Sequence, residues 1–418
     1  MNLDYPIWHP YTQMQTAGMP IKIVRGEKEF LYDEYENSYI DAISSWWVNL
    51  HGHAHPTIAK AIYEQAQQLE QVIFAGFTHQ PAINLAELLL QRIPFHQKIF
   101  YSDNGSTAVE VAIKMALQYW KNKGEQRHKI ICFTDSYHGD TFGSMSVSAR
   151  GVFTQPYQEL LFEVCFIDTP TNDNSTAVTA QLEAHLNSNT VAAFIFEPLV
   201  LGSAGMLMYS AETLNTLLEI CRQKNVLTIA DEVFTGFGRT GKFLATDYCS
   251  QKPDIICLSK GITGGFMPFA ATTCTQEVYE QFLSPEKTKM LFHGHSYAGN
   301  PLGCAAAIAS LQIFESEKTF EKIKQIIPLH QQFAQAMRAH PTVHSVRQHG
   351  TILALEVKNK LRTGYLNPLS DSLKKFALEQ GVLLRPLGNV VYIVPPYCIS
   401  AQSLQQVYGC ITAFLDKQ

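Results

Sequence analysis

The sequence predicts an α/β protein with a mostly parallel central sheet and a smaller α+β domain built from both chain ends. In the middle of the chain, short runs that are apolar throughout alternate with segments that carry apolar residues at helical spacing. This is the pattern of a buried parallel sheet covered by helices. The chain has 418 residues, more than the roughly 250–300 at which a single core stops growing, so two domains are expected.

The expected elements follow from this pattern in chain order. A small antiparallel ribbon is expected near residues 20–45, where apolar and polar residues alternate. Buried strands are expected at 98–102, 129–133, 191–196, 226–230 and 254–258, with helices at 107–120 and 211–224. Beyond a helix at 301–315, short strands are expected at 352–357 and 390–394. We therefore assign residues 1–50 and 310–418 to the small domain and residues 51–309 to the large domain.

The bulk composition excludes several classes of protein. The net charge is −5 and no run of Lys and Arg forms a nucleic-acid patch, so nucleic acid is not expected as a partner. The start of the chain lacks the pattern of a signal peptide, and no apolar run reaches the roughly 20 residues that cross a bilayer. The nine cysteines are scattered and contain no CxxC pair. We therefore expect reduced thiols in a cytoplasmic protein. The charged fraction of 17% also favours association with a partner subunit.

Two segments resemble binding motifs but lack the required context. Residues 236–242 match GxGxxG and nearly match a P-loop, yet Phe243 stands where a P-loop needs Ser or Thr. No strand directly precedes these glycines, so we expect a tight loop beside the functional site, with nucleotide binding as the alternative. Three histidines at 51, 53 and 55 suggest a metal site, but no nearby Cys or carboxylate completes a ligand set. No metal is expected.

Five residues are expected at the same edge of the central sheet. Asp231 and Lys260 follow two expected strands, and ligands of open α/β sheets bind at the carboxyl ends of strands. Gly105 and Ser106 precede an expected helix, whose N-terminus attracts phosphate. Tyr137 follows the strand at 129–133. Singly, these residues could be a helix cap, a surface lysine, an ordinary N-cap and a core aromatic. Together they meet the needs of pyridoxal 5'-phosphate (PLP): an amine, a carboxylate for the ring nitrogen, a phosphate cup and an aromatic cover.

Five segments resemble the class III aminotransferases of the fold-type I PLP enzymes. They are Ser-Asp-Asn-Gly-Ser (102–106), Tyr-His-Gly-Asp-Thr (137–141), Ile-Ala-Asp-Glu-Val (229–233), Gly-Phe-Gly-Arg-Thr-Gly (236–241) and Leu-Ser-Lys-Gly (258–261). The resemblance runs over essentially the whole chain. It implies that Lys260 bonds covalently to PLP and is the catalytic residue, and that Asp231 pairs with the pyridine nitrogen.

The same resemblance implies a homodimer with shared active sites. Gly105, Ser106 and Ser296 would hold the phosphate, with Ser296 supplied by the neighbouring subunit. Tyr137 would stack on the ring. The chain departs from the family at His293-Gly294-His295-Ser296, where Gly-Pro-Thr is usual. Ser296 keeps the hydroxyl, whereas His295 replaces a rigid proline.

Narrower segments are similar to the branch of the family that aminates 8-amino-7-oxononanoate in biotin biosynthesis. These segments are residues 7–12, 44–47, 114–120, 137–141 and 394–397. The resemblance implies S-adenosylmethionine, or else lysine, as the amino donor. The substrate pocket would be lined by Tyr11, Trp46, Trp47, Tyr137, Gly294, Arg385 and Tyr392. Arg385 would bind the distal carboxylate, for which its guanidinium offers a bidentate fork.

Alternatives remain open at this point. Another class III aminotransferase, acting on an ω-amino acid or an ornithine-like donor, is the nearest, although the Trp8 and Trp46-Trp47 segments count against it. A PLP mutase or racemase is the second. Trp46 and Trp47 are adjacent, and adjacent residues on a strand face opposite ways, so we expect one of the two to pack in the core.

Overall fold

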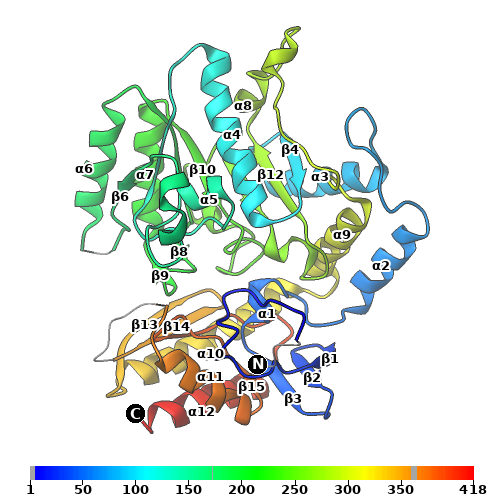
Figure 1. Cartoon of the computed structure of the whole chain (residues 1–418), viewed down its shortest axis with the longest axis vertical. Helices are drawn as coiled ribbons and strands as arrows, with labels where there is room; N and C mark the ends of the chain where they lie inside the picture. Colours follow the sequence, from blue (N-terminus) through cyan, green and yellow to red (C-terminus); the bar gives the residue numbers. More distant parts are fainter. Residues whose placement is uncertain (1–4, 172, 359–364) are drawn as a thin grey trace.

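A seven-stranded sheet forms the centre of the larger, upper part of the molecule (Figure 1). The computed structural model describes residues 5–171, 173–358 and 365–418. In spatial order the strands are β4 (Lys98–Ser102), β12 (Ala270–Cys274), β11 (Ile255–Leu258), β10 (Leu227–Asp231), β7 (Val191–Phe196), β5 (Lys129–Phe133) and β6 (Cys165–Ile167). Only β12 runs antiparallel to its neighbours β11 and β4. The predicted α/β class with a mostly parallel sheet is therefore confirmed.

Helices cover both faces of this sheet. Helix α4 (Gly105–Lys123) packs on one face in its own apolar core, whereas α3 (Gln80–Arg92), α6 (Ser175–Leu186) and α7 (Ala211–Gln223) pack in the core on the other. Helix α4 begins where the Asn104 side chain accepts the N–H of Thr107, and it ends at Gly124, whose φ of 84° suits a glycine. Its N-terminus is thereby fixed directly after β4, at the edge of the sheet where Asp231 ends β10.

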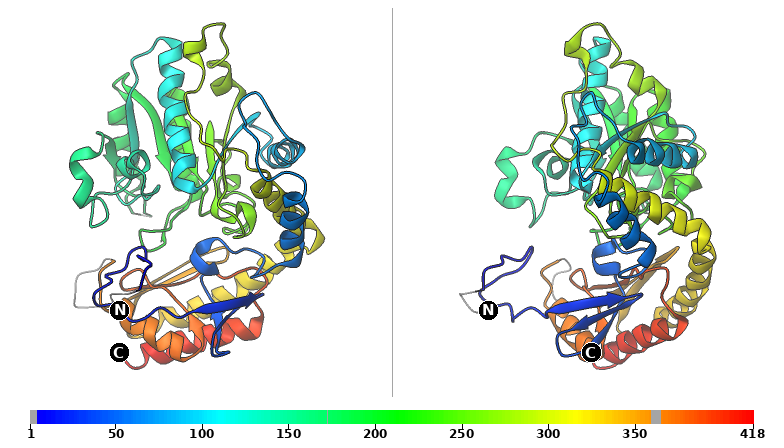
Figure 2. Two further views of the ribbon diagram at one scale, coloured as in Figure 1. Left: turned by 45° about the vertical axis from the view of Figure 1, so that its right-hand side comes forward. Right: turned by 90° about the vertical axis from the view of Figure 1, so that its right-hand side faces the viewer.

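The remaining upper elements are short or peripheral. They are α2 (Pro56–Ala66), α5 (Phe142–Ser146), α8 (Gln276–Glu280), the strands β8 (Val200–Leu201) and β9 (Leu207–Met208), and the 3-10 turns at Gln155–Leu160, Ala245–Tyr248, Lys260–Thr263 and Lys287–Lys289. The chain passes from the upper to the lower part through α9 (Pro301–Ser316) and α10 (Thr319–Arg338), which Figure 2 shows in yellow.

The lower part of the molecule joins the two chain ends. The antiparallel ribbon β1 (Ile23–Glu27), β2 (Phe30–Asp33) and β3 (Ser38–Asp41) is extended by β15 (Val382–Leu383), which pairs with β3 in parallel. A second sheet contains β13 (Val343–His349), β14 (Ile352–Val357) and β16 (Val390–Ile393), with α11 (Leu369–Glu379) and α12 (Ala401–Leu415) packed nearby (Figure 1). The predicted domain boundary at residue 309 falls inside α9.

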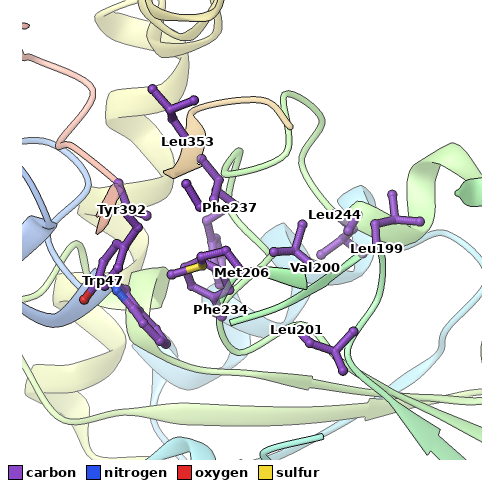
Figure 3. Packing of buried hydrophobic residues seen from close by; sticks show 14 of the residues in the cluster. Trp47, Leu199, Val200, Leu201, Met206, Phe234, Phe237, Leu244, Leu353 and Tyr392 are labelled. Atoms are coloured by element: carbon purple, nitrogen blue, oxygen red, sulfur yellow. The ribbon is translucent and has the colours of Figure 1, made fainter. Parts of the chain in front are cut away.

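One segment differs from the sequence-based expectation. Ser44–Trp47 (α1) is a tight irregular turn, although we expected Trp46 and Trp47 on a strand. Trp47 packs against Phe234 and Tyr392, with ring centroids 4.5 Å and 5.9 Å apart (Figure 3). This apolar cluster packs residues of the lower part, Trp47 and Tyr392, against Phe234 of the upper part. No helix among the described residues has the length and apolar character needed to cross a membrane.

Candidate active site

A cavity of about 310 Å³ lies at the carboxyl edge of the central sheet, between the upper and lower parts. This is within the size range of small-molecule sites. The predicted site residues that line it are Tyr11, Trp46, Trp47, Gly105, Ser106, Tyr137, Asp231, Lys260 and Arg385. They come from segments scattered over the whole chain, so the fold alone brings them together. Asp231 ends β10, and Lys260 lies two residues beyond β11, the neighbouring strand.

Lys260 presents its amine to the cavity from an apolar setting. Its Nζ lies 4.9 Å from the ring centroid of Trp47 and 5.8 Å from that of Phe234. Burial lowers the pKa of Lys260 below its usual value, while the nearby Asp231 carboxylate acts in the opposite direction. The result is an amine that is more easily neutral, as bond formation with an aldehyde requires.

Asp231 is buried and held by two hydrogen bonds. Its Oδ2 lies 2.7 Å from His138 Nδ1, and its Oδ1 accepts the N–H of Val233 at 3.0 Å. These bonds fix the plane of the carboxylate while it lines the cavity. His138 Nε2 is also buried, without a hydrogen-bond partner among the described residues.

Gly105 and Ser106 form a cup at the N-terminus of α4. The first N–H groups of a helix have no partner within the helix. Asn104 accepts that of Thr107, and within the described part of the chain the N–H groups of Gly105 and Ser106 have no acceptor, so they remain for a ligand. Glycine is required here, because a Cβ on Gly105 would lie 2.7 Å from Val233 Cγ1. Backbone N–H groups, a hydroxyl and the positive end of the helix dipole fit a phosphate.

These groups fit PLP. One cavity contains a partly buried lysine, a fixed carboxylate on the neighbouring strand and an anion cup at a helix N-terminus. Tyr137 lines the same cavity, where its N–H donates to Glu197 Oε1 at 3.0 Å. Burial raises the pKa of Tyr137 far above its usual value, so its ring stays neutral.

Several aromatic residues and a cation, Arg385, also line the cavity. The Arg385 guanidinium lies 4.2 Å from the ring centroid of Trp46 and donates to the Tyr365 hydroxyl at 3.2 Å. Phe153 packs against Tyr365, with centroids 4.8 Å apart. Within the described ranges, Arg385 forms no ion pair with a carboxylate. The guanidinium is therefore available to a ligand.

Tyr11 closes the aromatic wall beside the phosphate cup. Its hydroxyl donates to the carboxylate of Asp140, and its ring lies 5.7 Å from that of Trp46. Burial and the bond to Asp140 raise the pKa of Tyr11 to about 12. The hydroxyl is therefore a hydrogen-bonding group at neutral pH and carries no charge.

Three predicted residues do not line this cavity. Gly294 and Ser296 lie on the exposed loop before α9, where the Ser296 carbonyl accepts Gln71 Nε2. Tyr392 is buried behind Trp47, because the alternation of β16 turns it into the apolar cluster. It therefore supports the pocket wall from outside. The expectation that one of Trp46 and Trp47 would pack in the core is confirmed for Trp47, although both indoles line the cavity.

Comparison with known proteins decides the family. A family model described as aminotransferase class-III matches residues 11–415. The chain belongs to the class-III aminotransferase family. It is 45% identical to the adenosylmethionine-8-amino-7-oxononanoate aminotransferase of Synechococcus elongatus, over 98% of both chains. It is 38% identical to the Helicobacter pylori enzyme of the same name, over 100% of this chain and 97% of the relative.

Solved structures agree with this class-III assignment. The enzyme of that name from Methanocaldococcus jannaschii has a TM-score of 0.93 and 38% identity, covering 98% of this chain and 97% of its own. A PLP-bound amine transaminase from an uncultivated Pseudomonas species has a TM-score of 0.93 and 31% identity, with full coverage of both chains. The predictions of family, enzyme class and cofactor are thereby confirmed: this chain is a PLP-dependent aminotransferase.

The sequence-based reasoning missed several residues of this class-III site, among them His138 and Glu197. His138, which binds Asp231, stands inside the Tyr137–Gly139 segment that was singled out, but the sequence does not show which residue it faces. Glu197 lines the cavity and accepts the N–H groups of Tyr137 and Gly202. Burial raises its pKa to about 7. Glu197 directly follows the strand expected at 191–196, the same signal that identified Asp231.

Proposed function

We propose that this class-III aminotransferase transfers an amino group to 8-amino-7-oxononanoate, forming 7,8-diaminononanoate in biotin biosynthesis, with S-adenosylmethionine as the donor. The names of the relatives at 45% and 38% identity support this acceptor. The observation that carries the proposal is the position of Arg385. Its guanidinium lies against Trp46 in the same cavity as Lys260, without a carboxylate partner among the described residues.

The cavity suits an aliphatic chain with a distal carboxylate. Trp46, Tyr11 and Phe153 supply aromatic walls against which methylene groups lose contact with water. Arg385 then offers a charge-assisted, bidentate contact to the carboxylate at the end of the chain. The Tyr365 hydroxyl, which accepts from Arg385, orients the guanidinium.

Four residues of the chain would hold the cofactor. Gly105 and Ser106 would bind the phosphate, Asp231 would keep a proton on the pyridine nitrogen, and Lys260 would form the covalent bond. When bound, PLP supplies an aldehyde that condenses with amines and a ring that accepts electrons from the substrate Cα. Tyr137 covers the ring and helps to exclude water.

Lys260 is the residue that moves protons. Its Nζ takes the Cα proton of the donor and returns a proton to the acceptor in the second half of the cycle. Burial lowers the pKa of Lys260, which favours the neutral amine that can act as a base. The hydrogen bond to His138 keeps the Asp231 carboxylate in one orientation.

A second copy of the chain would complete the site. Ser296 and Gly294 lie outside the cavity of their own chain, on a loop that also exposes the aromatic side chains of Phe292 and Tyr297. Exposed aromatic groups at this density suit a subunit interface. We infer a homodimer in which Ser296 of one protomer reaches the phosphate cup of the other, in the cytoplasm.

The proposal is tested with the purified PLP-loaded enzyme. It is incubated with 8-amino-7-oxononanoate and either S-adenosylmethionine or lysine, and 7,8-diaminononanoate is measured by mass spectrometry. Formation of the product with S-adenosylmethionine supports the full proposal. Formation of the product with lysine but not with S-adenosylmethionine would keep the proposed acceptor and make lysine the donor. Turnover of ω-amino acids without diaminononanoate would overturn the proposed acceptor.

Variants at Arg385 test the carboxylate contact. Arg385→Met is expected to raise KM for 8-amino-7-oxononanoate by about ten- to a hundredfold, the effect of losing a charged hydrogen-bond partner. Arg385→Lys keeps the charge without the bidentate fork, so its KM should lie between those of the wild type and Arg385→Met. An unchanged KM in Arg385→Met would remove Arg385 from the acceptor site.

A further inference from the structure

The turn Ser44–Trp47 is strained at three residues that are not glycine. The φ angles are 52° at Ser44, 60° at Ser45 and 69° at Trp47. Ser45 also has ψ of −76°, a combination that L-residues rarely adopt. Such conformations persist where the surrounding structure enforces them, and they concentrate at functional sites.

This strain has a visible consequence for the pocket. On a regular strand, Trp46 and Trp47 would face opposite ways. In the turn, both indoles line the same cavity. Trp47 lies against Lys260 at the reacting end, and Trp46 lies against Arg385 at the carboxylate end. One short segment therefore contacts both ends of the space that a substrate would fill.

Asp41 holds this turn from outside the cavity. Its Oδ2 accepts the N–H of Ser45 at 2.6 Å and the Ser45 hydroxyl at 3.3 Å, while Oδ1 accepts the N–H of Ile43 at 3.2 Å. His53 Nε2 lies 2.9 Å from the same Oδ2. Asp41 is fully buried, and a buried carboxylate is costly unless hydrogen bonds compensate it. Two of its four compensating bonds are made to Ser45 in the strained turn.

The other end of the turn is also held by a buried side chain. Arg239 donates to the carbonyls of Trp47, at 3.2 Å, and Asn49, at 3.3 Å. The Ser44 hydroxyl donates to the carbonyl of Val394 at 2.8 Å. The backbone on both sides of Trp46 is thus held, by Val394 of the lower part on one side and by Arg239 of the upper part on the other.

We propose that Asp41 is a positioning residue that determines acceptor length. By binding the N–H of Ser45 it keeps the strained turn, which holds Trp46 and Trp47 across one cavity and so fixes the space between Lys260 and Arg385. This inference rests on the proposed function, in which the acceptor is a nine-carbon carboxylate. Release of the turn lets Trp46 swing away, and the cavity then accepts longer chains.

The test measures binding of aliphatic acids to the PLP-loaded enzyme, without turnover. Heptanoate, nonanoate and undecanoate are the probes, and isothermal titration calorimetry gives each dissociation constant. The wild type should bind nonanoate most tightly. In Asp41→Asn, affinity should rise with chain length up to undecanoate, as hydrophobicity dictates, and the preference for nonanoate over undecanoate should fall by about tenfold.

Two matched pairs separate positioning from general damage. Asp33 is an equally buried carboxylate on the neighbouring strand that accepts two backbone N–H groups remote from the cavity. Asp33→Asn should therefore keep the wild-type preference. Ser45 is exposed, so Ser45→Val leaves the core intact but opposes positive φ, whereas Ser45→Gly tolerates it. Valine should abolish the preference and glycine should retain it.

The outcomes are decisive in each case. A wild-type length preference in both Asp41→Asn and Ser45→Val would overturn the proposal, as would an equal loss in the two controls. If Asp41→Asn fails to fold, the Ser45 pair alone decides. A wild type that prefers another chain length, and does not aminate 8-amino-7-oxononanoate, would refute the proposed function, while the Ser45 pair would still test the role of the turn.

Discussion

His138 Nδ1 lies 2.7 Å from Asp231 Oδ2, and both side chains are buried beside the cavity. The two residues are 93 positions apart in the chain. Since Asp231 also accepts the N–H of Val233, its carboxylate has one orientation. Because the carboxylate is already fixed before the cofactor binds, binding does not cost it rotational freedom. We therefore expect the histidine to contribute to cofactor affinity by holding this carboxylate in place.

Replacement of His138 should weaken PLP binding. A hydrogen bond to a charged group contributes about 1.5–3 kcal/mol, so His138→Ala should raise the dissociation constant of PLP by about ten- to a hundredfold. His138→Asn places an amide N–H near the position of Nδ1 and should recover most of the affinity. Equilibrium dialysis of the PLP-free proteins measures the dissociation constant of PLP for both variants. Equal weakening in the two variants would show that the ring matters by its volume alone.

Lys260 should destabilise the cofactor-free fold at neutral pH. Its pKa is lower in the folded chain than in the unfolded one, so the unfolded chain binds more protons and stability rises with pH through this window. Lys260→Met should therefore unfold at higher urea concentration than the PLP-free wild type at pH 7. This advantage should shrink as pH approaches the ordinary lysine pKa of about 10.4. A difference that does not change with pH would contradict the lowered pKa.

The same variant tests the covalent role of Lys260. Borohydride reduction of the PLP-loaded wild type should add the mass of the cofactor to the peptide that contains Lys260. Lys260→Met should give no labelled peptide and no transamination. Labelling of another lysine in the wild type would show that this other residue, and not Lys260, bonds covalently to PLP.

The sequence predicted the sheet edge well because strand ends are a local signal. Asp231 and Lys260 were found since each follows an apolar run, and β7 is as buried as its six apolar residues indicated. The turn at Ser44–Trp47 could not be predicted, because no glycine marks its positive φ angles. Those angles are imposed by Asp41 and Arg239, partners that only the folded chain brings near. Tyr392 was misplaced for a similar reason: its neighbour Trp47 lies between it and the cavity.

Glu197 should give the protein a pH-dependent stability. Burial raises its pKa from 4.5 to about 7, so the folded chain binds more protons than the unfolded chain between these values. Stability then falls as pH rises from about 4.5 to 7, by about 3 kcal/mol from this group. Glu197→Gln should lack that decline, so its stability relative to the wild type should increase over the same window. Urea denaturation at several pH values measures the effect.

Glu232 provides the matched control for Glu197. Its pKa is also raised to about 7 by burial, but it binds Thr235, Ala245 and Thr246 away from the cavity. Both Gln variants should change the stability profile. Only Glu197→Gln should move the acid limb of the kcat profile to lower pH, because the Glu197 charge raises the pKa of the Lys260 amine that is free in the substrate complex. An equal shift in Glu232→Gln would exclude a direct effect at the site.

Gly139 should be essential for the phosphate cup although it is not part of it. Its φ is 132°, and a Cβ at this position would lie 2.1 Å from Ser106 Oγ. The Ser106 hydroxyl also accepts the N–H of Asp140, and this hydrogen bond would break if the side chain moved away. Gly139→Ala must therefore displace Ser106, and we expect PLP affinity to fall by about tenfold or more through loss of one hydrogen bond to a charged group. Gly151→Ala, where no atom lies within 4 Å of the added Cβ, should bind PLP like the wild type. Wild-type affinity in Gly139→Ala would show that the Ser106 hydroxyl does not hold the phosphate.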